Sequence, residues 1–271
     1  MQKPSKINIM KTTMYRDERI CHLEKYAENM PINGIYKGKP YSHILKIDRF
    51  NKRQIVSCYN IIQGVSSDLL PLSLHRFAHH LNSSQILCYN FFRPMLTESG
   101  RATEKLVTLL EKYGIKIALG SECTFEYNDG AGDGTEFDFH INSGEVEVFF
   151  EIKYTEQGFG RANDDDKHKK KFEEIYKGNL LNKEKCLLEK PGYKEFIRDY
   201  QLYRNAIRII NKNKFLVLLY PKANGVVHKQ ADTFIRDKIN NIYKENVKAL
   251  HWEDVISDKN CELYCKYFGQ E

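Results

Sequence analysis

Apolar and polar residues alternate over two neighbouring stretches in the middle of the chain, residues 136–141 and 145–153. Alternation of this kind is the pattern of a β-strand with one buried face. Asn142 to Gly144 separate the two stretches, and glycine tolerates the positive φ that hairpin turns require. The pattern therefore predicts an antiparallel hairpin with a two-residue turn at Ser143 and Gly144.

That turn would determine which residues face each other. Three predicted cross-strand pairs are apolar: Phe137 with Phe150, Phe139 with Val148, and Ile141 with Val146. A slip by one residue would mix every pair, so the predicted register is well specified. The opposite face of the hairpin then carries Asp138, His140, Glu147, Phe149, Glu151 and Lys153.

Two acids and a lysine on this opposite face form a candidate catalytic site. In the predicted register Glu151 lies opposite Glu136 and diagonal to Asp138, and diagonal neighbours lie roughly 7–8 Å apart at the backbone. Two carboxylates at that separation can converge on Mg²⁺ or Mn²⁺, with the backbone carbonyl of Ile152 as a further ligand. Such a metal would polarise a scissile phosphate and lower the pKa of a bound water. Lys153 would orient this water or offset charge on the phosphate.

An acid-x-lysine tripeptide by itself is usually a solvated strand face, so the elements around the hairpin matter. Leucines at helical spacing predict a helix that ends at Gly114. An apolar run at 215–220, stopped by Pro221, predicts a strand buried on both faces. Other expected elements are helices at 16–28, 72–92 and 193–210, strand material at 115–117 and 124–127, a loop at 129–134, and a tail with a helix after residue 229 and a strand at about 247–252.

Asp138 followed by Glu151-Ile152-Lys153 resembles the PD-(D/E)xK nuclease superfamily, although Phe137 stands where that family often has proline. A wider likeness to a little-characterised bacterial subgroup of restriction endonucleases covers about residues 83–205. The segments that carry it are Ser83-Ser84-Gln85, Asn90-Phe91-Phe92, Phe125-Glu126-Tyr127, Glu151 to Glu156 continuing to Phe159-Gly160, and Tyr200 to Asn205. The resemblance implies a mixed α/β (α+β), restriction-endonuclease-like core of helix, three antiparallel strands, helix and strand, in which a mixed central sheet is flanked by helices.

The resemblance also implies an additional acid near the metal. Glu126 is the first choice, and Glu98 and Glu104 are alternatives that would otherwise be solvated surface residues. Glu156, just past the third core strand, would either bind a second metal or cap a turn.

Two residues of the second core helix have two interpretations each. Gln201 would touch the phosphate or the lysine, or only bond to backbone. Arg204 would clamp a phosphate or pair with a structural acid.

The implied function is a Mg²⁺-dependent DNA endonuclease of restriction or other defence against invading DNA, in which Mn²⁺ would substitute for Mg²⁺. A non-catalytic nucleic-acid-binding module and a nuclease acting on RNA, single-stranded or branched DNA are the alternatives.

We expect three regions. Residues 1–95 would be a helical region with a DNA-binding or dimerisation role, residues 96–221 the nuclease core with an insertion at 155–192, and residues 222–271 a helix and strand that extend the core. Within the insertion, the run from Asp164 to Lys171 has two interpretations, a contact with phosphate or, more favoured, a solvated charge run.

Charge and cysteines add little to this interpretation. The chain has 42 Lys and Arg against 36 Asp and Glu, which is compatible with a polyanionic partner such as DNA. The seven cysteines, without a secretory signal, suggest reduced thiols in a cytoplasmic protein. No stretch approaches the ~20 apolar residues of a membrane span.

Three histidines, His75, His79 and His80, invite a metal-site interpretation. No cysteine or acid spacing supports it, so we favour structural or surface histidines over a metal site. Contact with DNA, together with Arg76, is a further alternative.

Overall fold

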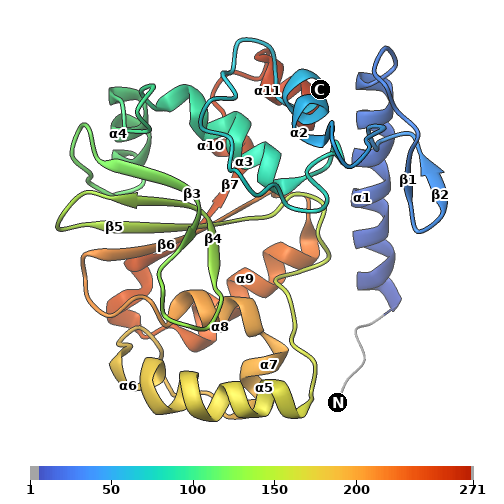
Figure 1. Cartoon of the computed structure of the whole chain (residues 1–271). Helices are drawn as coiled ribbons and strands as arrows, with labels where there is room; N and C mark the ends of the chain where they lie inside the picture. The colour runs from blue at the N-terminus through green and yellow to red at the C-terminus, as the bar shows by residue number, and fades with distance from the viewer. Residues whose placement is uncertain (1–5, 270–271) are drawn as a thin grey trace.

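The computed structural model describes residues 6–269, and its centre is a five-stranded sheet of order β3-β4-β5-β6-β7 (Figure 1). The strands are β3 (Glu122–Asn128), β4 (Glu136–Asn142), β5 (Glu147–Ile152), β6 (Lys214–Tyr220) and β7 (Val247–His251). The first three are antiparallel, and β6 and β7 run parallel to β5. Helices flank this mixed sheet, so the expected α+β architecture is confirmed.

The hairpin of β4 and β5 has a register that differs by two residues from the prediction. Phe139 pairs with Phe150 and Ile141 with Val148. The reason is the turn: Ser143 donates a backbone hydrogen bond to Val146, so Gly144 and Glu145 are the two turn residues. Gly144 has φ +80° while Glu145 does not adopt a positive φ, as in a type II′ turn with glycine first.

The alternation of β4 is interrupted at Asp138. Phe139 stacks on Phe92 with ring centroids 4.1 Å apart, whereas Phe137 packs against Phe149 at 4.7 Å in a separate core cluster. Opposite this point in β3, Glu126 has φ +51°, which is uncommon for a residue with a Cβ. The prediction that Phe137 shares a face with Phe139 is therefore wrong.

Both faces of the sheet are buried. Val217 and Leu219 of β6 join the cluster under α3 (Ser84–Phe92) and α4 (Glu104–Glu111), and Leu216 and Leu218 join the cluster under α8 (Tyr200–Ala206) and α9 (Gly225–Lys238). This confirms the prediction of a strand buried on both sides. It also means that Phe149, placed on the polar face by the sequence pattern, lies in the second core.

Several predicted boundaries are wrong. The helix expected at 72–92 is only α3, because residues 72–83 form turns and Ser83 caps the helix through its side chain. The helix expected at 193–210 is interrupted at Asp199 and splits into α7 (Tyr193–Arg198) and α8. Residues 115–117 are not part of a strand.

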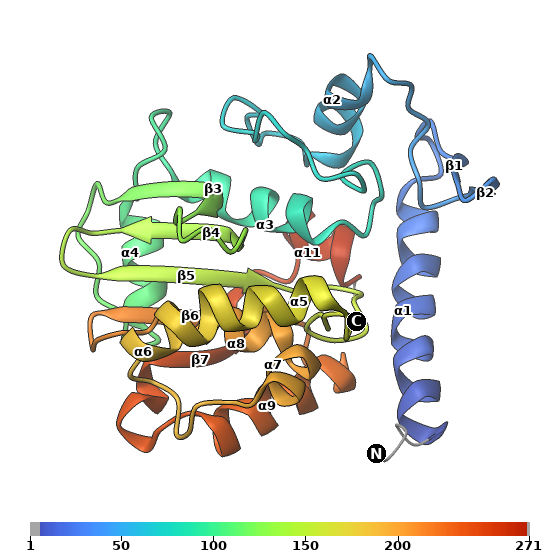
Figure 2. The ribbon, with the colours of Figure 1, turned by 60° about the horizontal axis from the view of Figure 1, so that its bottom comes forward.

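The N-terminal region is less helical than expected. It comprises α1 (Lys6–Tyr26), a small hairpin of β1 (Gly34–Tyr36) and β2 (Lys39–Tyr41), α2 (Lys52–Ile55) and a π-helix, η1 (Val56–Asn60). Figures 1 and 2 place this hairpin and α1 at one end of the molecule and α4 at the opposite end. None of the described helices is long and apolar enough to cross a membrane.

The remaining elements complete the periphery. They are η2 (Arg93–Met95), α5 (Asp166–Lys171), η3 (Phe172–Leu180), α6 (Leu181–Lys183), η4 (Asn241–Asn246), α10 (Trp252–Val255) and α11 (Glu262–Tyr267).

Candidate active site

Because β4 and β5 are antiparallel, the start of β4 lies beside the end of β5. Continuing the observed register by one pair beyond Phe139 and Phe150 brings Asp138 opposite Glu151. The backbone N–H of Ile152 donates to Oδ2 of Asp138 at 2.6 Å. The revised register thus brings the two predicted acids closer in the ladder than the diagonal placement expected from the sequence.

Three donors hold the buried carboxylate of Glu151, which is 2% exposed. Lys153 donates from Nζ to Oε1 at 2.5 Å, and Gln201 donates from Nε2 to the same oxygen at 2.7 Å. Asn205 donates from Nδ2 to Oε2 at 2.7 Å. Since Gln201 and Asn205 are one helical turn apart on α8, this helix determines how the carboxylate is oriented.

The acids at this site repel one another. Burial and then the charge of Glu151 raise the pKa of Asp138 well above its usual range. Burial alone would lower the pKa of Lys153, but the carboxylates of Glu151, Glu156 and Asp138 outweigh it and raise that pKa. Lys153 therefore stays a cation in a buried position, where it compensates part of the negative charge.

Glu126 is the third acid of this group. Burial raises its pKa to about 7, and Glu136 and Glu151 add to the shift by repulsion. Beside it, Gln85 accepts a hydrogen bond from the backbone N–H of His75, and the side chain of Gln85 opposes the shift by lowering the pKa of Glu126. The positive φ of Glu126 adds backbone strain of a kind that is common at functional sites.

The acids of this site carry oxygen donors of the kind that bind hard divalent cations. The described residues contain no group of three or more His, Cys, Asp or Glu side chains already arranged around a metal position. However, Asp138 and Glu126 have raised pKa values, first because both carboxyl groups are buried and then because the charge of Glu151 acts on each of them. A hard cation such as Mg²⁺ or Mn²⁺ is the group that such a set would accommodate.

The other residues predicted from the sequence have separate positions. Glu156 accepts a backbone hydrogen bond from Tyr154 at 2.5 Å, as a residue that caps a turn does, and it also acts on the pKa of Lys153. Glu98 and Glu104 are exposed and form no hydrogen bond or ion pair with the described acids of the site.

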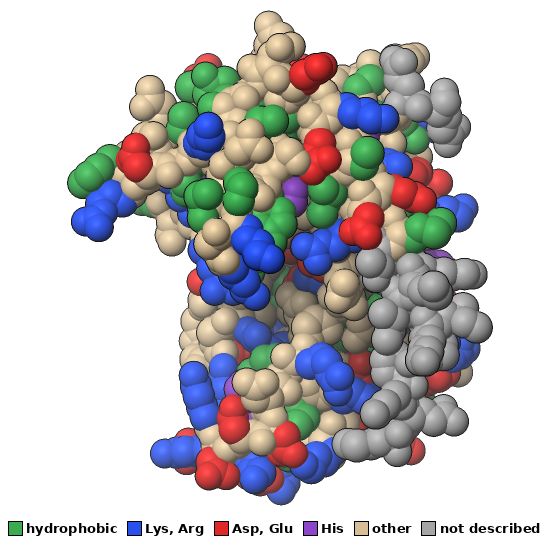
Figure 3. All heavy atoms as spheres, turned by 90° about the vertical axis from the view of Figure 1, so that its right-hand side faces the viewer, with side chains coloured by type: hydrophobic (Ala, Val, Ile, Leu, Met, Phe, Trp, Pro, Cys, Tyr) green, Lys and Arg blue, Asp and Glu red, His purple; other side chains and the backbone are tan. Residues whose placement is uncertain are grey.

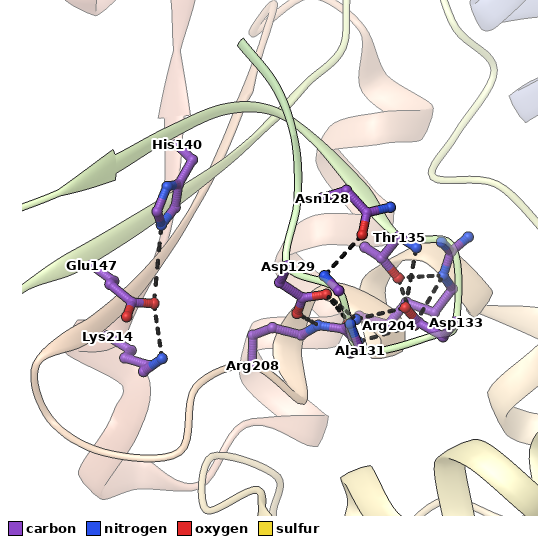
Figure 4. A network of polar contacts seen from close by, with 11 residues as sticks. Asn128, Asp129, Ala131, Asp133, Thr135, His140, Glu147, Arg204, Arg208 and Lys214 are labelled. Atoms are coloured by element: carbon purple, nitrogen blue, oxygen red, sulfur yellow. Dashed lines mark hydrogen bonds and ion pairs between the residues drawn. The ribbon is translucent and has the colours of Figure 1, made fainter. Parts of the chain in front are cut away.

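Of the two interpretations of Arg204, the structure shows the pairing with a structural acid, so its guanidinium is not free. Its Nε donates to Thr135 at 2.9 Å and lies 3.8 Å from a carboxylate oxygen of Asp133. Four residues on, Arg208 binds both Asp129 and Asp133, with Nη2 2.7 Å from Oδ1 of Asp133 (Figure 4). These contacts tie the loop between β3 and β4 to the helix that carries Gln201 and Asn205. No local sequence signal indicated Arg208, because its partners are about 75 residues away.

The charge run at 164–171 is largely helical. Asp165 caps α5 through its side chain, and Lys169 pairs with Asp166 within the helix. Lys171 donates to the backbone carbonyl of Asp133.

The histidines do not share a helical face, because residues 72–83 are not helical. Burial lowers the pKa of His79 to about 4 and that of His80 to about 3, so both rings are neutral.

Comparison with known proteins bears on the family. A model of the family described as "Restriction Endonuclease associating with ARP" matches residues 22–268. No curated protein and no solved structure matches the chain. The matched range contains the whole sheet and every residue of the candidate site, from Glu126 to Asn205. The chain therefore belongs to this restriction-endonuclease family.

Proposed function

We propose that the chain is a Mg²⁺-dependent endonuclease of the PD-(D/E)xK type, which hydrolyses DNA phosphodiester bonds in restriction or other defence against invading DNA. The observation that carries the proposal is the position of Asp138 opposite Glu151 with the buried cation of Lys153 on the same carboxylate. The family match supports the nuclease class.

Each residue has a role in this proposal. Asp138 and Glu151, with the carbonyl of Ile152, would hold the cation, which when bound would polarise the phosphate and lower the pKa of a water ligand. Lys153 keeps its proton and offsets negative charge at the reacting phosphate. Gln201 and Asn205 keep Glu151 in one orientation. Glu126, with a pKa of about 7, is suited to accept a proton near neutral pH.

Cleavage of duplex DNA in Mg²⁺ or Mn²⁺ tests the proposal. Wild type should cut, and Lys153→Ala and Asp138→Asn should each lose at least about 100-fold in rate, because each removes a group aimed at the transition state. Lys112→Ala, which changes an exposed lysine immediately after α4, is the matched control and should cut like wild type. Equal trace cleavage by wild type and Lys153→Ala would show that this site does not carry the reaction.

A binding module without catalysis is the second candidate, and one observation favours it. The carboxylate of Glu151 already accepts from three side-chain donors, so a metal must share this carboxylate with them. Calorimetric titration with Mn²⁺ separates the two candidates. Binding that disappears in Asp138→Asn supports the enzyme, and its absence in wild type supports the binding module. Parallel reactions with single-stranded DNA, branched DNA and RNA identify the polymer, which the motif does not specify.

A further inference from the structure

The positive charge of the chain is concentrated in one short region. Residues 31–80 contain seven Lys and Arg, two Asp and no Glu, a net charge of +5, while the whole chain carries +6. One of the two acids, Asp68, is already paired with Arg93 at 2.9 Å. We call residues 31–80 the basic lobe. Its charge is a local feature, since the rest of the chain is close to neutral.

Cations and aromatic rings alternate on the surface of the basic lobe. The turn of the β1–β2 hairpin is Lys37-Gly38, and Lys37 Nζ lies 5.4 Å from the ring centroid of Tyr36. The Tyr36 ring meets Phe77 edge-on at 5.4 Å, and the guanidinium of Arg76 lies 4.5 Å from the Phe77 centroid. A surface on which cations lie beside aromatic rings fits nucleic acid, whose phosphates and bases require these two kinds of contact.

The exposed cations of this surface have no carboxylate partners among the described residues. Among the described residues, no ion pair involves Lys37, Lys39, Lys46, Arg49 or Arg76. Lys52 and Arg53 differ: Lys52 donates to the carbonyl of His75 at 2.6 Å, and Arg53 donates to the carbonyl of Pro71 at 2.8 Å. These two residues hold the loops of the lobe together, which leaves the other cations available for a partner.

The basic lobe borders the candidate active site. The backbone N–H of His75 donates to Gln85, which lies beside Glu126. Two residues after the lobe, Asn82 donates from Nδ2 to Oγ1 of Thr155 at 2.8 Å, immediately past β5. Figure 3 views the end of the molecule that carries the β1–β2 hairpin and shows a hollow with Lys and Arg side chains around its rim. A polyanion bound along this lobe would be led toward the carboxylates.

We infer that the basic lobe is the surface on which double-stranded DNA docks, with Lys37, Lys39 and Arg76 in contact with the phosphate backbone. The inference deepens the proposed function and rests on it, since it names the substrate surface of the same site. Phosphate contacts of this kind position the duplex without reading its sequence. They are electrostatic, so each one adds about 0.9 to the slope of binding affinity against salt concentration on logarithmic axes.

The test measures binding without cleavage. Fluorescence anisotropy of a labelled duplex is followed in EDTA at several salt concentrations, with wild type and the triple variant Lys37→Glu/Lys39→Glu/Arg76→Glu. We expect the variant to bind at least about tenfold more weakly and its salt slope to fall by about three, one for each lost phosphate contact. The matched control, Lys105→Glu/Lys112→Glu/Lys116→Glu, makes the same change of charge at the opposite end of the molecule and should lose much less.

The outcomes separate this inference from the proposed function. Wild-type binding by the triple variant, an equal loss in both triple variants, or no duplex binding by wild type would overturn the docking inference. If wild type cuts DNA while the triple variant binds and cuts equally well, only the inference fails. If the triple variant loses binding but wild type never cuts, the docking surface stands and the nuclease proposal fails. Thermal melting of each variant shows whether it is folded.

Discussion

Asn205 donates a hydrogen bond from Nδ2 to Oε2 of Glu151 at 2.7 Å, and both side chains are buried. The other carboxylate oxygen accepts from Lys153 and Gln201. The amide of Asn205 is therefore the only side chain among the described residues that restrains the second oxygen. This makes Asn205 a positioning residue for the carboxylate that the proposal assigns to the metal.

Asn205→Ala should weaken Mn²⁺ binding and lower the cleavage rate by about 10- to 100-fold, the usual effect of losing a partner that orients a ligand. Asn205→Asp should be worse, because a second carboxylate would face Glu151. Calorimetry with Mn²⁺ measures the first effect. Asn246→Ala is the control: Asn246 is also buried and donates to the carbonyls of Lys212 and Lys214, so it should lose stability but keep Mn²⁺ affinity. Equal loss of affinity in both variants would contradict a positioning role.

Glu126→Gln should stabilise the metal-free protein at alkaline pH. The pKa of Glu126 is raised from 4.5 to about 7 in the folded state, so the folded protein binds the proton more tightly than the unfolded chain. This contribution to stability is complete below pH 4.5 and is lost as the pH rises through about 7. The shift corresponds to at most about 3 kcal/mol of unfolding free energy.

Chemical denaturation at pH 4 and pH 8 in EDTA measures this effect. The gain of Glu126→Gln over wild type should appear at pH 8 and be absent at pH 4. Glu104→Gln, at an exposed position on α4, provides the control and should show no such difference. If the gain in stability is the same at both pH values, the ionisation of Glu126 does not destabilise the folded protein.

Arg208→Ala should cost about 3–5 kcal/mol of unfolding free energy, because it removes the nearest cation from the buried carboxylate of Asp133. Burial would raise the pKa of Asp133, but the hydrogen bond and the charge of Arg208, together with the hydrogen bonds from Thr135, outweigh this and lower it to about 2. The ion pair therefore stabilises the protein above pH 3.8 and is lost as the pH falls toward 2.

Urea denaturation at pH 7 tests this, with Arg198→Ala as the control, since Arg198 pairs with Asp199 at the surface and should cost less than about 1 kcal/mol. The double variant Arg208→Ala/Asp133→Asn should recover part of the loss. If it recovers nothing, the cost comes from packing and not from the unpaired charge.

Lys266→Met should reduce the dependence of folding stability on pH at alkaline pH. Lys266 is fully buried, and burial lowers its pKa from 10.5 to about 7. Because the folded state binds this proton less tightly, the contribution of the amine to stability is complete above pH 10.5 and is lost as the pH falls through about 7. Wild type should gain stability between pH 7 and pH 10, and Lys266→Met should gain less, by on the order of 3 kcal/mol.

Guanidinium denaturation at these two pH values measures the difference. The ammonium donates to the backbone and side-chain oxygens of Asn60. Asn90 still donates to the backbone oxygen, but Lys266→Met removes the donor to the side-chain oxygen and so lowers stability at both pH values. The test therefore depends on the slope with pH and not on the absolute stability. A slope unchanged from that of wild type would show that the amine keeps its proton in the folded protein.

The local pattern of the sequence was sufficient for the main elements of the sheet. Alternation predicted β4 and β5, and the apolar run at 215–220 predicted β6, because burial on one or both faces leaves its trace in successive residues. The acid-x-lysine spacing placed Glu151 and Lys153 on one side of a strand for the same reason. Periodicity failed at 72–92, where residues 72–83 form turns and only residues 84–92 are helical.

The tertiary structure decided what local patterns do not encode. The choice of Gly144 and Glu145 as turn residues shifted the hairpin by two positions, and this shift brought Asp138 opposite Glu151. Asn205 and Arg208 acquire their roles from partners 54 and 75 residues away. Such contacts depend on how a helix packs across a sheet, and packing is a property of the whole chain. The sequence thus determined which groups were available, and the fold determined which of them meet.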